Sequence, residues 1–149
     1  MAKLVAPSLK TNILAMEPLW LFYREAKGKP ATLPDLKGWR ISVGTPGSGV
    51  PALFTRLLAA NGLTPQDVRL RELEQTPGTM AFLGGKVDAL VFASAPEAMM
   101  VQMLLQTPGV ALMPFPQAQA YASRLGFLTP VTLPQGVVDL AHNQPAHDV

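Results

Sequence analysis

Short apolar runs alternate with amphipathic stretches along this chain, and glycines and prolines separate them. Runs of four to eight apolar or alternating residues are typical of strands, whereas apolar residues spaced three and four apart indicate helices. The pattern therefore predicts strands at 18–25, 39–44, 67–73, 87–92 and 109–115. It predicts helices between them, at 48–62, 76–85, 94–107 and 116–126.

Alternating strands and helices with apolar strands predict an α/β fold. We expect a three-layer α/β/α lobe with a mostly parallel sheet, because strands buried on both faces read as continuous apolar runs. The 149 residues are long enough for one domain with a real core, so a single lobe over 1–149 is expected. Ligands of such sheets lie at the carboxyl ends of the strands.

Serine and threonine residues stand where three of the predicted helices begin. Ser48, Thr76 and Ser94 are predicted N-caps, since a short side-chain oxygen accepts a hydrogen bond from the first helical turn. Gly62 is expected just past the end of the first of these helices. Ser48 and Ser94 follow predicted strands directly, so both turns are expected at the carboxyl edge of the sheet.

The stretch "GTPGSGV" at 44–50 is the most distinctive turn of the chain. We expect the backbone N–H groups at 48–50 and the hydroxyls of Thr45 and Ser48 to bind a small anion, typically a carboxylate. A purely structural role for Ser48 as a helix cap remains open at this point.

Two nucleotide-binding patterns overlap this turn. Gly44 and Gly49 satisfy half of the G-x-x-x-x-G-K-[ST] pattern, but the Lys that reaches phosphates is absent, so that interpretation fails. The dinucleotide pattern G-x-G-x-x-A is matched by Gly47, Gly49 and Ala52 and would need an acid such as Glu72 after the next strand. A dinucleotide-binding domain of an oxidoreductase is kept as an alternative.

The composition narrows the possible partners and activities of this chain. Twelve basic against ten acidic residues give a net charge of +2, and the basic residues are scattered, so no nucleic-acid partner is expected. The chain has no cysteine, and its two histidines lie in the polar tail "AHNQPAHDV", where we expect no metal site. No histidine stands near a serine, so neither catalysis nor a cofactor is expected. The first ten residues lack the apolar region of a signal peptide.

Two further groups of residues are given structural roles. Asp88, in "GKVDAL", is expected to pair with Lys86 or to cap a turn. Four methionines at helical spacing are expected to fill the core, namely Met80, Met99, Met100 and Met103.

These segments together resemble a known family. "LKGWRISVGTPGSGVPALFTRLLAANGL" followed by "GKVDALVFASAPEAMMVQMLL" is similar to the substrate-binding proteins of TAXI-type TRAP transporters, which are type II periplasmic binding proteins related to NMT1-like proteins. The matching segments are Asp35–Val50, Ala59–Leu63, Gly85–Phe92 and Ala93–Pro96, within a resemblance that covers most of 15–135.

The resemblance implies a bilobed periplasmic receptor that closes on a small carboxylate-bearing or amino-acid-like solute and delivers it to a membrane permease. The residues that match the family's two cleft turns are Thr45, Pro46, Gly47, Ser48, Gly49 and Val50 in the first and Ser94, Ala95 and Pro96 in the second. Full-length members are longer, and this chain resembles their central lobe with hinge-like segments near 12–25 and 127–145. Val50 and Pro51 stand where relatives often carry polar residues, which favours a less polar solute or fewer backbone donors.

Two other functional classes stay open from the sequence. One is the effector-binding domain of a transcription regulator, which shares the lobe design but would need a helix-turn-helix segment. The other is a lobe that binds nothing by itself. Apolar residues that a second lobe would cover also predict a homodimer; these are Leu19, Trp20, Phe22, Phe127 and Val131.

Overall fold

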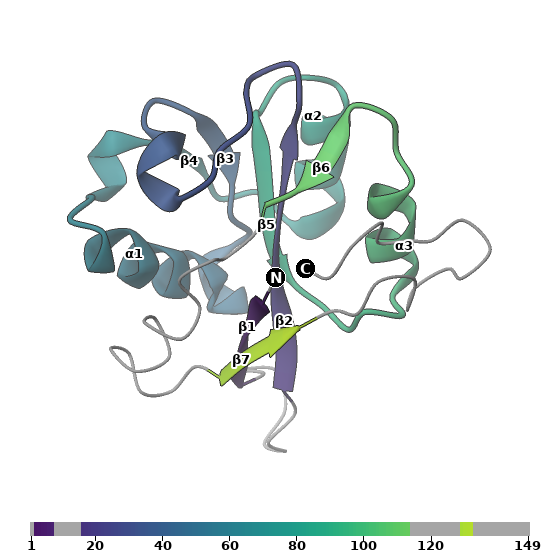
Figure 1. The fold of residues 1–149 in the computed structure, drawn as a ribbon, viewed down its shortest axis with the longest axis horizontal. Coiled ribbons are helices and arrows are strands. Elements are labelled where there is room, and N and C mark those ends of the chain that lie inside the picture. Colours follow the sequence, from purple (N-terminus) through teal and green to yellow (C-terminus); the bar gives the residue numbers. More distant parts are fainter. Residues whose placement is uncertain (1, 8–15, 114–128, 133–149) are drawn as a thin grey trace.

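Seven strands form one mixed sheet in the order β4-β3-β5-β2-β1-β7, and β6 pairs with β2 (Figure 1). The structure is a computed structural model that describes residues 2–7, 16–113 and 129–132. The strands are β1 (Ala2–Pro7), β2 (Met16–Arg24), β3 (Arg40–Ser42), β4 (Arg69–Arg71), β5 (Ala89–Ala93), β6 (Val110–Leu112) and β7 (Thr129–Thr132). The α-helices are α1 (Val50–Ala60), α2 (Gln75–Leu83) and α3 (Met99–Leu105), and single 3-10 turns are η1 (Leu33–Leu36), η2 (Pro46–Ser48) and η3 (Pro65–Asp67).

The predicted α/β class is confirmed, and the sheet is mixed. Strand β3 runs parallel to both β4 and β5, as expected for strands joined through helices. Strand β2 runs antiparallel to β5, to β6 and to β1, and β1 is antiparallel to β7, so fewer pairings are parallel than the sequence suggested. The long β2 strand, buried on both faces, therefore forms the middle of the sheet.

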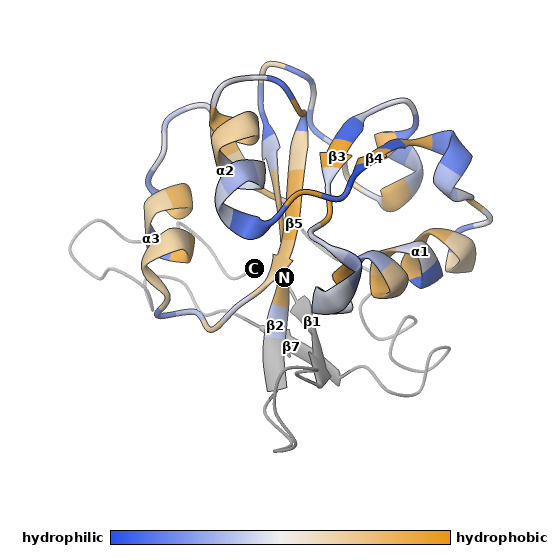
Figure 2. Cartoon of the chain, turned by 180° about the vertical axis from the view of Figure 1, so that it is seen from behind, coloured by the Kyte–Doolittle hydropathy of each residue, from blue (hydrophilic) through white to orange (hydrophobic). Residues whose placement is uncertain are grey.

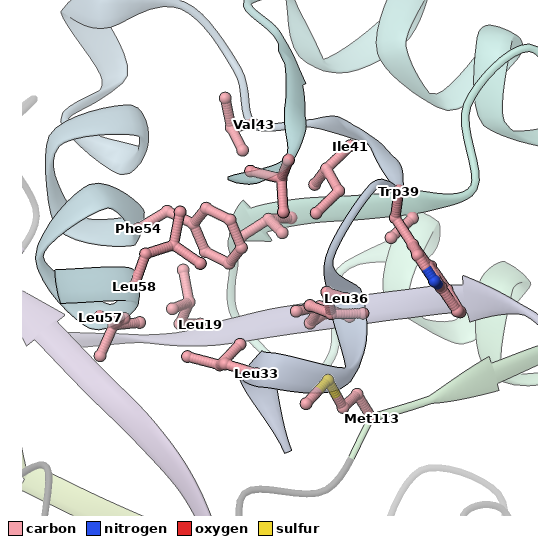
Figure 3. Packing of buried hydrophobic residues seen from close by; sticks show 14 of the residues in the cluster. Leu19, Leu33, Leu36, Trp39, Ile41, Val43, Phe54, Leu57, Leu58 and Met113 are labelled. Carbon is pink, nitrogen blue, oxygen red and sulfur yellow. The ribbon is translucent and has the colours of Figure 1, made fainter. Parts of the chain in front are cut away.

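The sheet separates two apolar clusters, which gives the expected three layers. On one face, Leu19 and Leu21 of β2 pack with Phe54 of α1 and with the η1 turn (Figure 3). On the other face, Trp20 and Phe22 pack under α2 and α3. Successive residues of a strand point to opposite faces, so one apolar run supplies both clusters. Figure 2 shows β5 as hydrophobic along its length for the same reason.

Burial removes one argument for a dimer. Leu19, Trp20 and Phe22 were expected to need cover from another lobe, but at most 1% of each is exposed, because the α-helices of this chain already cover them. Phe127 lies outside the described residues, and so does the predicted helix at 116–126. Residues 16–24 of the first hinge-like segment form β2, and a hinge there stays a prediction.

The apolar face and the C-terminal end of helix α1 are as its sequence indicates. Its buried residues recur at helical spacing, as in Leu53, Leu57 and Leu58. Gly62 has a φ of 73°, and the N–H of Leu63 donates to the carbonyl of Leu58 at 2.9 Å, which is the Schellman arrangement of a helix end.

Three details of the helices differ from prediction. Helix α1 has Gly49 rather than Ser48 at its N-cap. Helix α2 has Glu74 at its N-cap, two residues before the predicted cap Thr76. Three of the four methionines expected in the core are exposed, namely Met80 by 69%, Met99 by 85% and Met103 by 40%. The spacing that places methionines on one helix face does not say which face is buried. Among the described residues, no helix is both long and apolar enough to cross a bilayer.

Candidate functional site

Three segments leave the sheet at the same edge, which we call the carboxyl edge. They are the turn 43–50 after β3, the segment 72–76 after β4 and the segment 94–98 after β5. Ser42 of β3 pairs with Arg71 of β4 and with Leu90 of β5, so β3 and β4 end side by side, and the parallel strand β5 continues in the same direction to Ala93. The prediction that the turns after 44 and 93 share one edge is therefore confirmed by the strand pairing.

The turn after β3 is stiffened by its own hydrogen bonds. Gly44 and Gly49 have backbone φ values of 81° and 77°. Residues other than glycine rarely adopt such positive φ values. Between them, the Ser48 hydroxyl donates to the carbonyl of Thr45 at 2.7 Å and accepts from the N–H of Val50 at 3.3 Å. The Ser48 hydroxyl thus links the turn to the first N–H group of α1, although Ser48 stands one residue before the N-cap.

The donors that the turn presents differ from those expected. The N–H groups of Ser48 and Gly49 donate to the carbonyls of Thr45 and Pro46, and that of Val50 is taken by Ser48. Within the described residues, by contrast, the N–H groups of Gly44, Thr45 and Gly47 and the Thr45 hydroxyl have no hydrogen-bond partner. Thr45 is half-buried and Gly47 exposed, so a ligand can reach these donors. Their use by a solute stays a prediction.

The segment after β5 has a different structure from the one predicted. Helix α3 begins at Met99, with Ala98 at its N-cap, so Ser94 does not cap it. Instead, the Ser94 N–H donates to the Pro18 carbonyl at 3.1 Å, and its carbonyl accepts from the Trp20 indole at 2.8 Å. These hydrogen bonds to β2 engage the backbone of Ser94, and they override the local capping preference. The predicted N-cap role of Ser94 is therefore wrong, whereas solute binding by Ser94, Ala95 and Pro96 stays a prediction, and the segment does lie at the carboxyl edge.

The opposite end of the sheet, the amino edge, carries a paired polar cluster. Asp88, whose side chain is 6% exposed, accepts from the Arg40 backbone N–H and side chain at 2.9 Å each and lies 3.9 Å from Lys27 Nζ. Arg40 also donates to the Gly85 carbonyl. The predicted pairing of Asp88 with Lys86 is wrong, because β3 and β5 are neighbours and bring Arg40 onto the carboxylate.

The charges at Asp88 have a clear effect on its ionisation. Burial alone would raise the pKa of Asp88, but the hydrogen bonds from Arg40 and the charge of Lys27 outweigh it and leave the pKa below its ordinary value. The Asp88 carboxylate is buried, has fixed cationic partners and lies at the opposite end of the strands from the turns. We therefore assign it a role in stabilising the fold. It gives no indication of acid–base chemistry.

Sequence reasoning missed one polar residue at the carboxyl edge. Ser42 is 1% exposed, and its hydroxyl has no hydrogen-bond partner in the described part of the chain. A serine inside the otherwise apolar strand "RISV" could have been noticed, because a strand buried on both faces leaves no solvated side for it. Across the same residues, no three His, Asp or Glu side chains are grouped as a metal site would need.

Several solved structures that are similar to this chain are those of solute-binding proteins. The periplasmic aliphatic sulphonate-binding protein SsuA of Escherichia coli is 23% identical with a TM-score of 0.54; the match covers 81% of this chain and 40% of that one. The alkanesulfonate-binding protein SsuA of Xanthomonas axonopodis pv. citri, bound to MOPS, is also 23% identical with a TM-score of 0.54, over 83% and 44%.

A periplasmic binding protein from Brucella ovis with glutathione bound is 16% identical, with a TM-score of 0.53, over 66% of this chain and 30% of that one. The chain therefore spans less than half the length of these proteins, and the likeness establishes the type II binding-protein fold. The sequence pattern of one family matches residues 11–148, nearly the whole chain. On that match, the chain belongs to the NMT1-like family.

Proposed function

We propose that this chain is a solute-binding lobe of the receptor component of a membrane transport system. In this proposal the lobe works in the periplasm, binds a small carboxylate-bearing solute at the carboxyl edge and hands it to a permease, without catalysis. The TAXI type of TRAP transporter is the system that the sequence resembles. Membership of the NMT1-like family and the fold shared with sulphonate- and glutathione-binding proteins support the receptor role.

The observation that carries the proposal is the set of open donors at the turn 43–50. Three backbone N–H groups, at Gly44, Thr45 and Gly47, and the Thr45 hydroxyl stand beside the first turn of α1. Each hydrogen bond from such a donor to an anionic oxygen contributes roughly 1.5–3 kcal/mol when shielded from water. Because Ser48 already fixes the turn, little ordering is left to oppose binding.

The same geometry disfavours the dinucleotide alternative. A pyrophosphate in that fold binds the N–H groups at the helix N-terminus. Here Pro51 has no N–H, and the N–H of Val50 is taken by the Ser48 hydroxyl. The remaining open donors lie in the turn before the helix, where a single small oxyanion fits the donor set better than an extended pyrophosphate.

The direct test is a nuclear magnetic resonance titration of the ¹⁵N-labelled chain with acetate, succinate, L-glutamate, methanesulfonate and NAD. We expect a carboxylate to shift the amide signals of Gly44, Thr45 and Gly47 saturably. Thr45→Val, which keeps the side-chain shape, should weaken that binding about tenfold through loss of one donor. Thr107→Val is the matched control, because the Thr107 hydroxyl lies two residues past the end of α3 and donates to the Met103 carbonyl, not to a residue of the turn 43–50.

The outcomes separate the alternatives. Saturable shifts with methanesulfonate alone would keep the receptor role and replace the carboxylate with a sulfonate. Shifts with NAD alone would revive the dinucleotide interpretation. If all five compounds leave the spectrum unchanged, the lobe has no solute site for these classes and the proposal is wrong.

A further inference from the structure

The side chain of Trp20 in β2 reaches the segment that follows β5 at the carboxyl edge. Strands β2 and β5 lie side by side, and the last pair between them is Leu19 with Ala93 (Figure 1). One residue further on, the Trp20 indole N–H donates to the Ser94 carbonyl at 2.8 Å. The Ser94 N–H donates to the Pro18 carbonyl at 3.1 Å. Both backbone groups of Ser94 are therefore held by β2.

The position of the indole is itself fixed by packing. Trp20 is 0% exposed, and its ring stacks on Phe22 with 6.2 Å between the centroids and 13° between the planes. Phe22 in turn stacks on Phe92, at 6.0 Å and 15°. All three rings belong to the apolar cluster under α2 and α3. Because a close-packed ring cannot tilt without disturbing its neighbours, the indole N–H has one direction, and the Ser94 carbonyl is fixed at its end.

A tryptophan at this position needs an explanation beyond packing, since Phe22 and Phe92 show that phenylalanine fits the same cluster. The indole adds one polar group, and a buried N–H group without a partner would destabilise the fold. The acceptor that satisfies it is the first residue after β5, beyond the end of the strand pairing. The Trp20 N–H thus acts on a segment of the carboxyl edge.

The segment held in this way has donors of its own. In the described chain, the Ser94 hydroxyl and the Ala95 N–H have no hydrogen-bond partner, and both residues are half-buried. Pro96 has no N–H, and the Ala98 N–H donates to the Ala95 carbonyl at 3.1 Å, so the chain turns directly after these donors. The position of both donors therefore depends on where the Ser94 backbone is held.

The open donors after β3 and those after β5 belong to neighbouring strands. Strands β3 and β5 are parallel, and Ser42 pairs with Leu90. Three residues on from this pair, the first chain has reached Thr45 and the second has reached Ala93, the last residue of β5. Ala93 also packs against the apolar cluster to which Val50 of α1 belongs. A solute that contacts the turn after β3 therefore lies beside the segment after β5.

We infer that Trp20 is a positioning residue of the solute site. Through its bond to the Ser94 carbonyl, it holds the Ser94 hydroxyl and the Ala95 N–H where they meet the anionic group bound at the turn after β3. Trp20 itself is fully buried and does not touch the solute. This inference rests on the proposed function and adds a residue from the interior of the sheet to the site at the carboxyl edge.

The first test follows the two tryptophans of the chain in the ¹⁵N titration with acetate, L-glutamate and methanesulfonate. We expect the indole N–H signal of Trp20 to shift saturably, with the same dissociation constant as the amides of Thr45 and Ala95. The internal control is Trp39, which precedes β3 at the amino edge and packs edge-on against Tyr23 with 6.4 Å between the ring centroids. The indole signal of Trp39 should stay unchanged.

The second test removes the indole N–H and keeps an aromatic ring. Trp20→Phe should raise the dissociation constant about three- to tenfold, which is the loss expected for one hydrogen bond. It should also shift the Ala95 amide signal of the ligand-free chain. The control is Phe82→Leu, which disturbs the same apolar cluster from the side of α2. This control should lower the urea midpoint and leave the dissociation constant unchanged, because it does not alter the bond to Ser94.

The failures of the two proposals can be told apart. If the Thr45 amide shifts while the Trp20 indole does not, Trp20 has a structural role only and the receptor role stands. The inference is equally wrong if Trp20→Phe binds like the wild type, or if it weakens binding no more than Phe82→Leu does. If Trp20→Phe does not fold, the indole titration alone decides. If no amide at the carboxyl edge responds to any of the three anions, both proposals are overturned.

Discussion

The amino and carboxyl edges of the sheet differ in how many of their polar groups have hydrogen-bond partners. At the amino edge, the Asp88 carboxylate is fully engaged by the backbone and side chain of Arg40 and by Lys27. Arg24 likewise donates to the Phe82 and Leu83 carbonyls at the end of α2. At the carboxyl edge, a buried hydroxyl at Ser42 and several backbone N–H groups have no partner in the described chain.

This difference separates the residues that stabilise the fold from those that are available to a ligand. Paired groups stabilise the native state, because a buried charge without its partner is costly. Unpaired donors lower stability and are retained where a ligand completes them. The amino edge is therefore expected to respond to mutation through stability, and the carboxyl edge through affinity.

The largest expected effect is at the paired edge. Asp88→Ala removes the acceptor of the Arg40 N–H and leaves two cationic side chains without their partner. We expect the free energy of unfolding, measured by urea denaturation, to fall by about 2–4 kcal/mol. Glu97→Ala, which removes an exposed carboxylate, should change it little. Equal effects of the two variants would show that the cluster around Asp88 does not stabilise the fold.

The pH dependence of stability should follow from the same carboxylate. The folded-state pKa of Asp88 lies below its ordinary value of 3.8, so its contribution is present above that value and is lost as pH falls through the lower folded pKa. Urea midpoints measured from pH 5 to pH 2 should decline, and the decline should be shallower in Asp88→Asn. Asp35, whose pKa is lowered by the N–H groups of Ala31 and Thr32, should account for part of what remains. An identical slope in the variant would contradict this assignment.

A smaller effect of opposite sign is expected at the open edge. Ser42→Ala removes a buried hydroxyl that has no hydrogen bond, so the free energy of unfolding should stay unchanged or rise by up to about 1 kcal/mol. Thermal and urea unfolding of the ligand-free chain check this. A loss above about 1 kcal/mol would mean that the hydroxyl has a structural partner, and the comparison between the edges would fail.

The smallest effect on stability is expected at Thr45. Its hydroxyl makes no cap hydrogen bond, so Thr45→Val should leave the free energy of unfolding within about 0.5 kcal/mol of the wild type. Ser48→Ala, by contrast, removes two hydrogen bonds within the turn and should destabilise it measurably. Because the two hydroxyls are three residues apart in one turn, this pair separates binding donors from structural ones.

Local signals in the sequence were sufficient for much of the fold. The continuous apolar and aromatic run in "PLWLFYRE" identifies β2, and the helical spacing of Leu53, Leu57 and Leu58 identifies α1. Gly62 marks the end of α1 because its positive φ is a local requirement. The turn at 44–50 could be placed for the same reason.

Capping and pairing could not be read locally. Ser94 has the side chain of an N-cap, but its backbone is hydrogen-bonded to Pro18 and Trp20 of β2, and α3 begins only at Met99. Asp88 was matched to its neighbour in sequence, yet the parallel pairing of β3 and β5 brings Arg40 to it from 48 residues away. Which strand lies beside which is a property of the whole chain, so single-sequence patterns do not contain it.

The sequence by itself determined the α/β class, the order of most elements and the glycine turn that follows β3, because propensity and periodicity act over a few residues. Only the tertiary structure decided which polar groups are satisfied. It engages the N–H groups of 48–50 within the turn and leaves Ser42 beneath α2 without an acceptor. Hydrogen-bond satisfaction depends on what packs against a group, and packing joins residues that are distant in sequence.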